Sequence, residues 1–361
     1  MKAHPFLLFG LLVCALPLPA PADENAPHPM AVGSDPRIHY EGRFDFSALA
    51  GPVVVWAGSR ISLDFDGPRL VLHWGKATGQ NFFNVQVDGT TEVVGIPAGA
   101  SRETVWPHPL DPGRHRLTLF KRSEAAAGEV CFAGVEVAPG TEIRTPVPTA
   151  YRLRMEFLGD SITAGACNED GDKDQWEDRG THNFARSYAT LTSSAFAADL
   201  RCVAVSGMGI AMGWTDVKAG QVWDRIHPRV DAPRADLVAW QPEVAFVNLG
   251  ENDDSFPRAH NQPFPAGYTA GYVALVQSIR AAYPHARLVL LRGGMYGGSQ
   301  SAPLREAWTE AVRQLEAADP AISHYVFTHW SSTHPRVADH RAMADELIAW
   351  LKQQSFMKGF L

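Results

Sequence analysis

The sequence contains no block of Lys or Arg residues and only four cysteines among its 361 residues. Its formal net charge of −7 is mildly acidic, which argues against nucleic acid as a partner. No C-x-x-C pair and no Cys/His spacing typical of a metal site is present. We therefore expect neither a metal nor another cofactor.

No apolar run approaches the roughly 20 residues that a membrane-spanning helix needs. The apolar stretch 6–16 follows Lys2 and is interrupted by Pro17 and Pro19, before an Ala20-Pro21-Ala22 cleavage pattern. This arrangement predicts a signal peptide over residues 1–22 rather than a membrane anchor. We expect a protein that is secreted or periplasmic and does not bind membranes. Residues 23–37 are rich in Pro, Ala and acid, and we interpret them as a disordered leader.

Three cysteines remain after the predicted cleavage, Cys131, Cys167 and Cys202. They cannot all pair within one molecule. Either Cys167 and Cys202 form a disulfide or the thiols are free and buried.

The remaining composition, 45% hydrophobic and 20% charged, is that of an ordinary globular protein, and the length allows two domains. Apolar residues alternate with polar ones in short runs over residues 38–145. For example, the runs 61–65 and 70–74 flank Asp66-Gly67-Pro68, which indicates a hairpin. This segment predicts a β-sandwich of jelly-roll type. We assign it no chemistry; it either contacts carbohydrate or is purely structural.

Residues 146–151 contain two prolines and are interpreted as a linker. Over residues 152–361 the pattern changes to strands alternating with helices. This alternation predicts an α/β domain of three layers, with a mostly parallel sheet between helices. The expected strands cover residues 154–158, 202–205, 244–249, 288–291 and 325–327. A functional site should lie at the carboxyl ends of these strands.

Four chemically useful groups follow expected strands in this domain: Ser161 within Gly159-Asp160-Ser161-Ile162, Gly207, Asn252, and His334 before the last helix. A serine can act as a nucleophile when a base and oxyanion donors converge on it. A glycine allows close approach of a backbone N–H, an asparagine amide can donate, and a histidine can move a proton. The four groups in this order indicate a serine hydrolase.

These blocks resemble those of the SGNH (GDSL-type) hydrolases, over about residue 152 to the C-terminus. The sandwich in front, together with Glu177-Asp178, Ser187-Tyr188-Ala189 and Ser206-Gly207-Met208-Gly209, is similar to carbohydrate esterase family 2. The resemblance implies a flavodoxin-like SGNH domain that removes O-acetyl groups from acetylated xylan or glucomannan. Members of that family prefer the 6-position of hexose units.

The same resemblance implies a role for each residue. Ser161 would form an acetyl-enzyme, and His334 would act as general base and then acid. The N–H groups of Ser161 and Gly207 and the side chain of Asn252 would form the oxyanion hole. SGNH hydrolases usually carry an acid three residues before the histidine, but here that residue is Ser331. The resemblance therefore implies a Ser–His dyad.

Asp160 is expected to shape the serine loop by accepting hydrogen bonds from backbone N–H groups. Four aromatic residues are candidates for stacking on sugar rings, although core or loop packing is an open alternative for each: Trp330, Trp214, Tyr296 and Trp176. Trp330 is favoured because it lies near His334 in the sequence.

The sequence thus predicts a monomeric, secreted acetylesterase acting on acetylated polysaccharide or oligosaccharide. One alternative is a lipase- or thioesterase-type acyl hydrolase. Another is a carbohydrate-binding protein with a vestigial esterase domain.

Overall fold

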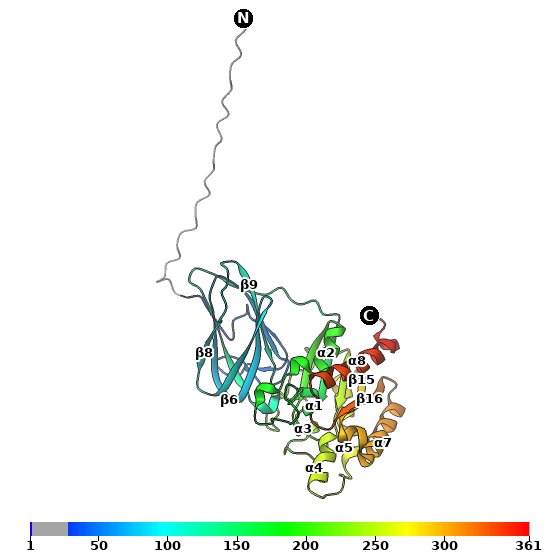
Figure 1. Ribbon diagram of the computed structural model, residues 1–361. Helices are drawn as coiled ribbons and strands as arrows, with labels where there is room; N and C mark the ends of the chain where they lie inside the picture. Colours follow the sequence, from blue (N-terminus) through cyan, green and yellow to red (C-terminus); the bar gives the residue numbers. More distant parts are fainter. Residues whose placement is uncertain (2–27, 361) are drawn as a thin grey trace.

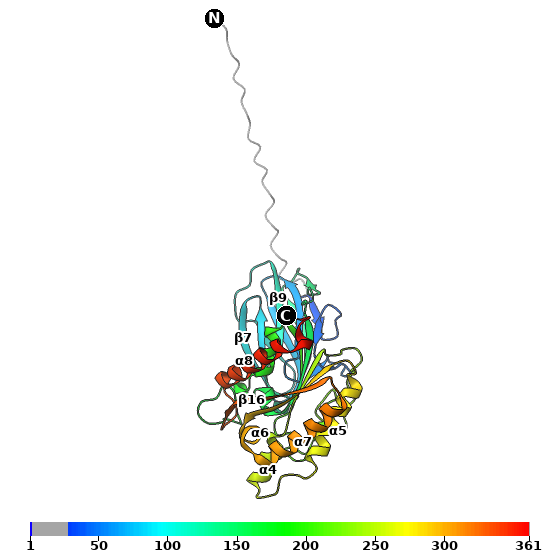
Figure 2. The same cartoon turned by 90° about the vertical axis from the view of Figure 1, so that its right-hand side faces the viewer.

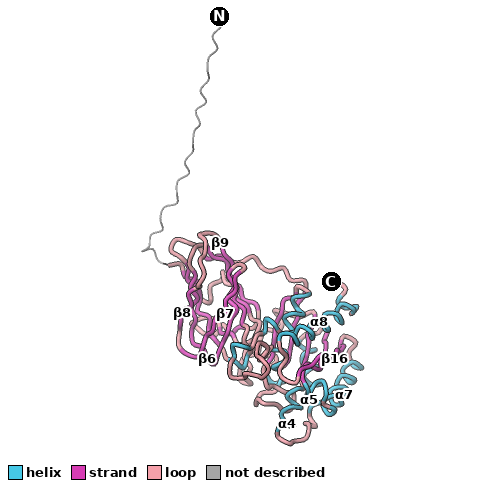
Figure 3. Tube along the Cα trace, in the orientation of Figure 1, coloured by secondary structure: helices cyan, strands magenta, loops and turns pink. Residues whose placement is uncertain are grey.

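The computed structural model describes residue 1 and residues 28–360, which form two domains that lie side by side (Figure 1). Strands dominate the first domain, whereas the second mixes strands with helices (Figure 3). The predicted signal peptide and the first residues of the predicted leader lie outside the described residues. No helix in the described part of the chain is long and apolar enough to cross a membrane.

The first domain is an antiparallel network of eleven short and long strands, which agrees with the predicted sandwich. In chain order they are β1 (Met30–Val32), β2 (His39–Glu41), β3 (Phe44–Asp45), β4 (Val53–Val54), β5 (Arg60–Asp66), β6 (Leu70–Val87), β7 (Thr90–Gly99), β8 (Arg102–Val105), β9 (Arg114–Lys121), β10 (Val130–Val137) and β11 (Ile143–Arg144). A short 3₁₀ helix, η1 (Ala125–Ala127), connects β9 to β10.

The long strand β6 joins the two layers of this domain. Its first half pairs with β8 and β10, and its second half pairs with β7 and β9. The expected hairpin between residues 61–65 and 70–74 is wrong. Both strands exist, but β9 lies between β5 and β6 in the sheet, because it pairs with each of them.

The prediction of a disordered leader over residues 23–37 is wrong for its described part. Met30–Val32 pairs antiparallel with β10, and Ala31 is completely buried in the sandwich core. A run of only three residues is too short to show a period-two pattern, so its pairing could not be predicted from composition.

The second domain contains a five-stranded, entirely parallel sheet in the order β13-β12-β14-β15-β16. Numbered along the chain this is the flavodoxin-like order 2-1-3-4-5. The strands are β12 (Leu153–Gly159), β13 (Ala198–Ala204), β14 (Val244–Asn248), β15 (Arg287–Met295) and β16 (Ile322–Ser331). The five predicted strands are thus all present, and β15 and β16 run several residues further than expected.

Helices cover both faces of this sheet, as Figure 2 shows for α5 and α7 on one side and α8 on the other. The α-helices are α1 (Ser161–Ala164), α2 (Tyr188–Ala195), α3 (Ala219–Val222), α4 (Glu251–Ala259), α5 (Tyr268–Ala282), α6 (Tyr296–Gln300), α7 (Ala302–Ala318) and α8 (Val337–Gln353). Buried residues of α3, α5 and α7 form one core cluster, and those of α2 and α8 form another. Since α1, α3 and α6 are short and polar or glycine-rich, the sequence pattern did not predict them.

The two domains share a buried interface. Val55, Trp56 and Ala125 of the sandwich belong to the same apolar cluster as α5 and α7. A fully buried ion pair joins Arg43 of the sandwich to Glu156 on β12, at 2.8 Å. Interfaces that are large and apolar hold domains in a fixed relation. The buried ion pair and the shared apolar cluster therefore pack the sandwich firmly against the parallel-sheet domain.

Candidate active site

Ser161 lies just after β12, an interior strand of the parallel sheet, and begins the single turn α1. Asp160 caps this turn, because its Oδ1 accepts a hydrogen bond from the N–H of Ile162 at 3.0 Å. Gly159 leaves room for the turn: a Cβ atom there would lie 2.1 Å from the hydroxyl of Thr163. Burial, with the nearby charges of Glu251 and other acids, raises the pKa of Asp160 well above its usual range. Asp160 therefore lies where a loop-shaping residue was expected.

Ser161 lines a cavity of about 450 Å³ together with Gly207, Asn252 and His334. The four groups that follow separate strands in the sequence thus meet at one place in the structure. In the described structure, no hydrogen bond joins Ser161 directly to His334. Catalytic hydrogen bonds of this kind often tighten only when a substrate is bound.

Two residues that line this cavity have backbone N–H groups free to act as donors. The N–H groups of Ser161 and Gly207 have no hydrogen-bond acceptor within the described part of the chain. Gly207 has a φ of +81°, and a Cβ atom on it would lie 3.0 Å from Cβ of Trp214. Only glycine adopts this conformation without strain. The requirement for glycine at this position is thus steric as well as conformational.

Asn252 lies in the first turn of α4 rather than in a loop. Its Nδ2 donates to Oδ2 of Asp160 at 3.1 Å and to the carbonyl oxygen of Met208 at 3.0 Å. Both amide hydrogens are therefore engaged in the unliganded site. Asn252 must exchange or share one of these bonds to donate to a substrate oxygen.

The acidic neighbours of Asn252 anchor two further segments of the chain. Glu251 accepts from the N–H groups of Gly297 and Gly298 in α6, at 3.0 and 2.8 Å. Asp253 accepts from three successive N–H groups, those of residues 210–212, at 2.7–2.9 Å. Burial raises the pKa of Asp253 to about 6, even though these three hydrogen bonds favour its ionised form. Gly297 and Gly298 at the start of α6 thus bind a protein carboxylate.

His334 has a carboxylate partner that the sequence analysis missed. Oδ2 of Asp174 lies 2.7 Å from Nδ1 of His334. Because an ionised carboxylate only accepts, His334 donates from Nδ1 and leaves Nε2 available to take a proton. Burial alone would raise the pKa of Asp174, but hydrogen bonds from His334 and Arg336 outweigh it and hold that pKa well below its usual range.

Arg336 fixes this pair by bridging the loop of Asp174 and the loop of His334. Its guanidinium forms an ion pair with Asp174 at 2.7 Å and donates to the carbonyl oxygens of His334, Cys167 and Gly171. Asp174, from a loop after Ser161, is therefore a candidate for a third member beside the Ser–His dyad that the resemblance implies. The local sequence signal was an acid-rich stretch, residues 169–174, without any regular period.

Cys167, Asp174 and His334 place one possible ligand atom each within 4.8 Å of one another. Two features disfavour a metal ion at this place. The Arg336 guanidinium already provides a positive charge beside Asp174, and burial raises the pKa of the Cys167 thiol. The expectation of no metal remains a prediction.

Cys131, Cys167 and Cys202 are all free and buried, so the alternative of a disulfide is excluded within the described chain.

The four candidate aromatic residues fall into two pairs. Trp176 and Trp214 line the cavity, and the Trp176 ring lies 5.4 Å from that of His334. Trp330 and Tyr296 do not line it; they pack edge to face with each other, with centroids 6.4 Å apart. Trp330 lies in β16 opposite Gly294 of β15, away from the cavity wall, so the preference for it as a sugar-stacking residue stays a prediction.

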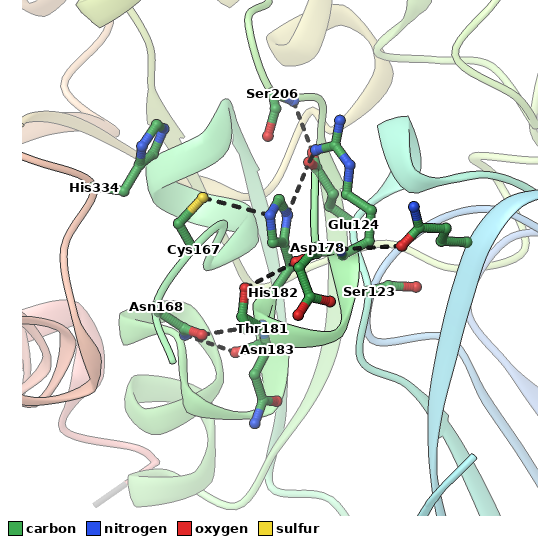
Figure 4. A network of polar contacts seen from close by, with 12 residues as sticks. Ser123, Glu124, Cys167, Asn168, Asp178, Thr181, His182, Asn183, Ser206 and His334 are labelled. Carbon is green, nitrogen blue, oxygen red and sulfur yellow. Dashed lines mark hydrogen bonds and ion pairs between the residues drawn. The ribbon is translucent and has the colours of Figure 1, made fainter. Parts of the chain in front are cut away.

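The sandwich also reaches the cavity, although the sequence analysis assigned it no chemistry. Ala126 of η1 lines the wall, and Glu124, just before it, accepts a hydrogen bond from the backbone of Ser206 (Figure 4). The close-up also shows Cys167 and His182 between this carboxylate and His334.

Comparison with known proteins agrees with this geometry. Residues 157–352 match the GDSL-like lipase/acylhydrolase family, and residues 40–148 match the carbohydrate esterase 2 N-terminal domain. The chain therefore belongs to the GDSL-like lipase/acylhydrolase family, and the predicted esterase class and fold are confirmed.

Individual relatives cover both domains. The chain is 31% identical to the cellulase/esterase CelE of Acetivibrio thermocellus over 89% of its own length but only 40% of that protein. It is 28% identical to an acetylxylan esterase/glucomannan deacetylase of Cellvibrio japonicus, over 89% of each chain. A family two carbohydrate esterase from Clostridium thermocellum, solved in complex with cellohexaose, is 30% identical with a TM-score of 0.76. That alignment covers 87% of this chain and 98% of the other.

Proposed function

We propose that the protein removes acetyl groups from acetylated polysaccharide through an acetyl-enzyme on Ser161. The observation that carries this proposal is the convergence of Ser161, the Gly207 N–H and the Asp174-bound His334 on one cavity. A serine, a base held in one tautomer and backbone oxyanion donors are the parts that ester hydrolysis requires.

In the first half of the reaction, Oγ of Ser161 attacks the acetyl carbonyl carbon while Nε2 of His334 takes the hydroxyl proton. The N–H groups of Ser161 and Gly207 hold the negative oxygen of the tetrahedral intermediate, and Asn252 joins them by releasing Met208 or Asp160. The ester bond then breaks, and the sugar oxygen leaves with the proton from His334.

In the second half, water attacks the acetyl group on Ser161. His334 takes a proton from this water and returns it to Oγ as acetate leaves. Asp174 stays ionised throughout and stabilises the imidazolium form of His334. Asp174 thus takes the role of the acid that is missing at the position of Ser331.

The substrate is proposed to be an acetylated oligosaccharide or polysaccharide, with 6-O-acetyl hexose units preferred. The Cellvibrio relative, an acetylxylan esterase/glucomannan deacetylase, and the cellohexaose complex of the Clostridium esterase support a glycan ligand. Trp176 and Trp214 give the cavity wall apolar ring faces with polar edges, as sugar binding requires. The protein is further proposed to be exported by its first 22 residues and to act as a monomer.

The first test is acetate release from acetylated glucomannan and from acetylated xylan by the mature protein. Wild type should release acetate, whereas Ser161→Ala and His334→Ala should not. The ratio between the two substrates then indicates the preferred position. Cleavage of a small aryl acetate without release from either polysaccharide would retain the mechanism and reject the substrate.

A second series of substrates tests the acyl group. Activity on aryl esters should fall steeply from acetyl to octanoyl, since the proposed function is specific for the acetyl group. Equal or rising activity with chain length would support a lipase- or thioesterase-type acyl hydrolase instead. Glycan binding without any acetate release would support a vestigial esterase.

A further inference from the structure

Glu124 is a carboxylate of the sandwich domain that is completely buried against the catalytic domain. It lies between β9 and β10 and immediately precedes η1. Burying a charged carboxylate costs free energy unless hydrogen bonds and charges compensate it. Its partners therefore indicate why this site retains an acid.

The partners of the Glu124 side chain all belong to the catalytic domain. Oε2 accepts from the backbone N–H of Ser206 at 3.1 Å. Oε1 accepts from the guanidinium of Arg179 at 3.0 Å and from Nδ1 of His182 at 3.2 Å (Figure 4). Burial would raise the pKa of Glu124, but the hydrogen bonds from His182 and Ser206 and the charge of Arg179 lower it overall.

The bond to Ser206 bears directly on the oxyanion hole. Ser206 and Gly207 are consecutive, so fixing the Ser206 N–H restricts the peptide that carries the Gly207 N–H. Asp253 holds the same loop on its other side, through residues 210–212. Gly207 thus lies between two buried carboxylates, one from each domain.

The sandwich presents Glu124 on a fixed backbone. Nζ of Lys121, itself completely buried, donates to the carbonyl oxygens of Ser123 and Glu124 at 3.1 and 3.2 Å. The next residues form η1, whose Ala126 lines the cavity. The Glu124 side chain is therefore already held in place before substrate binds. Catalysis by preorganised groups requires this condition.

We propose that Glu124 is a positioning residue of the oxyanion hole, so that the sandwich domain completes the active site of the esterase domain. This inference rests on the proposed roles of Ser161 and Gly207. It assigns the sandwich a part in turnover that is separate from any binding of glycan.

Two variants of Glu124 change the length and the charge of its side chain one at a time. Glu124→Asp keeps the charge beside Arg179 and His182 but withdraws the carboxylate from Ser206. Glu124→Gln keeps the length and removes the charge. The matched control is Glu129→Gln, because Glu129 also crosses the interface, to Arg229 and His227 at 3.0 and 3.1 Å, but does not contact the oxyanion loop.

The readouts are kcat and KM on an aryl acetate, the melting temperature, and inhibition by phenylboronic acid. Boron accepts a lone pair of Ser161 Oγ, the hydroxyl proton passes to His334, and the resulting anionic tetrahedral boronate places one of its hydroxyl oxygens in the hole. We expect kcat of both Glu124 variants to fall about 10- to 100-fold, with the inhibition constant rising in parallel and KM changing less than about threefold. Glu129→Gln should keep the wild-type kcat.

Each alternative outcome is distinct. A folded Glu124→Asp with wild-type kcat and boronate affinity overturns the inference. So does an equal loss of kcat in Glu129→Gln, because that result means a general effect of the interface. Retained activity in Ser161→Ala would instead refute the proposed function. If Glu124→Gln does not fold, Glu124→Asp decides alone, since it keeps the buried charge.

Discussion

Nδ1 of His334 and Oδ2 of Asp174 lie 2.7 Å apart although the two residues are 160 positions apart in the chain. This hydrogen bond fixes the tautomer in which Nε2 can accept a proton. Asp174→Asn should therefore lower kcat by about 10²-fold or more while KM on an aryl acetate stays nearly constant. Steady-state kinetics between pH 5 and 9 measure the loss.

Ser331→Ala is the control for this prediction, because Ser331 occupies the position where related hydrolases carry the acid. Its hydroxyl contacts only Thr333 in the described structure, through the side chain and the backbone N–H, both at 3.3 Å. We expect Ser331→Ala to keep the wild-type kcat. A large loss there, with full activity in Asp174→Asn, would contradict the assignment of Asp174.

Gly207→Ala should damage the oxyanion hole without unfolding the protein. The new Cβ atom would meet the side chains of Trp214 and Thr215 at 3.0 and 3.1 Å, in a backbone conformation that favours glycine. A shift of the N–H by even 1 Å should lower kcat by about 10²-fold. Gly220→Ala, at a helical position with open space around it, should leave kcat unchanged. Equal kcat for Gly207→Ala and wild type would exclude Gly207 from the hole.

Asn252→Ala should lower kcat by about 10²–10³-fold, as expected for the loss of one oxyanion donor. It also removes the bonds to Asp160 and to the Met208 carbonyl, so the melting temperature should fall. Kinetics and thermal unfolding of the same sample separate the two effects. A fall in melting temperature with unchanged kcat would mean that Asn252 only holds the loops together.

Trp214→Ala should raise KM for acetylated oligosaccharide about tenfold and leave KM for a small aryl acetate unchanged. Trp214 is 54% exposed and lines the cavity, with its Nε1 hydrogen-bonded to Ser255. Trp330→Ala is the matched change outside the cavity and should alter neither constant. If Trp330→Ala had the larger effect on oligosaccharide, the cleft would have to extend over β16.

We expect Lys121 to make the free energy of unfolding of the protein depend on pH. Burial lowers its pKa to about 7, from an ordinary value of 10.5. Between these values the unfolded chain binds more protons than the folded one, so the free energy of unfolding should rise with pH. Denaturant unfolding at pH 7 and pH 9 should show this rise, and Lys121→Met should reduce it. The same slope in both proteins would mean that Lys121 keeps its proton.

Period and turn chemistry were enough to predict the architecture. All five parallel strands were predicted because each contains a short apolar run between helical segments. The pairing of strands in the sandwich was harder to predict from the sequence. The pairing of β9 between β5 and β6 depends on contacts more than 25 residues apart, which no local pattern records.

The site was predictable where its residues directly follow strands. Ser161, Gly207, Asn252 and His334 do so or lie in the adjoining loop, and the structure brings all four to one cavity. Asp174 could not be predicted, because it lies in an irregular loop and acts across a distance in sequence. Glu124 was missed for another reason: it belongs to a different domain.

One turn of α4 holds three segments at once. Glu251 binds the start of α6, Asn252 the serine turn, and Asp253 the loop after β13. Successive helical residues point about 100° apart, so these three directions are set by the helix itself. Inserting or deleting one residue at this turn would misdirect all three contacts together. Laboratory evolution of substrate range should therefore not accept a change of chain length within residues 251–253.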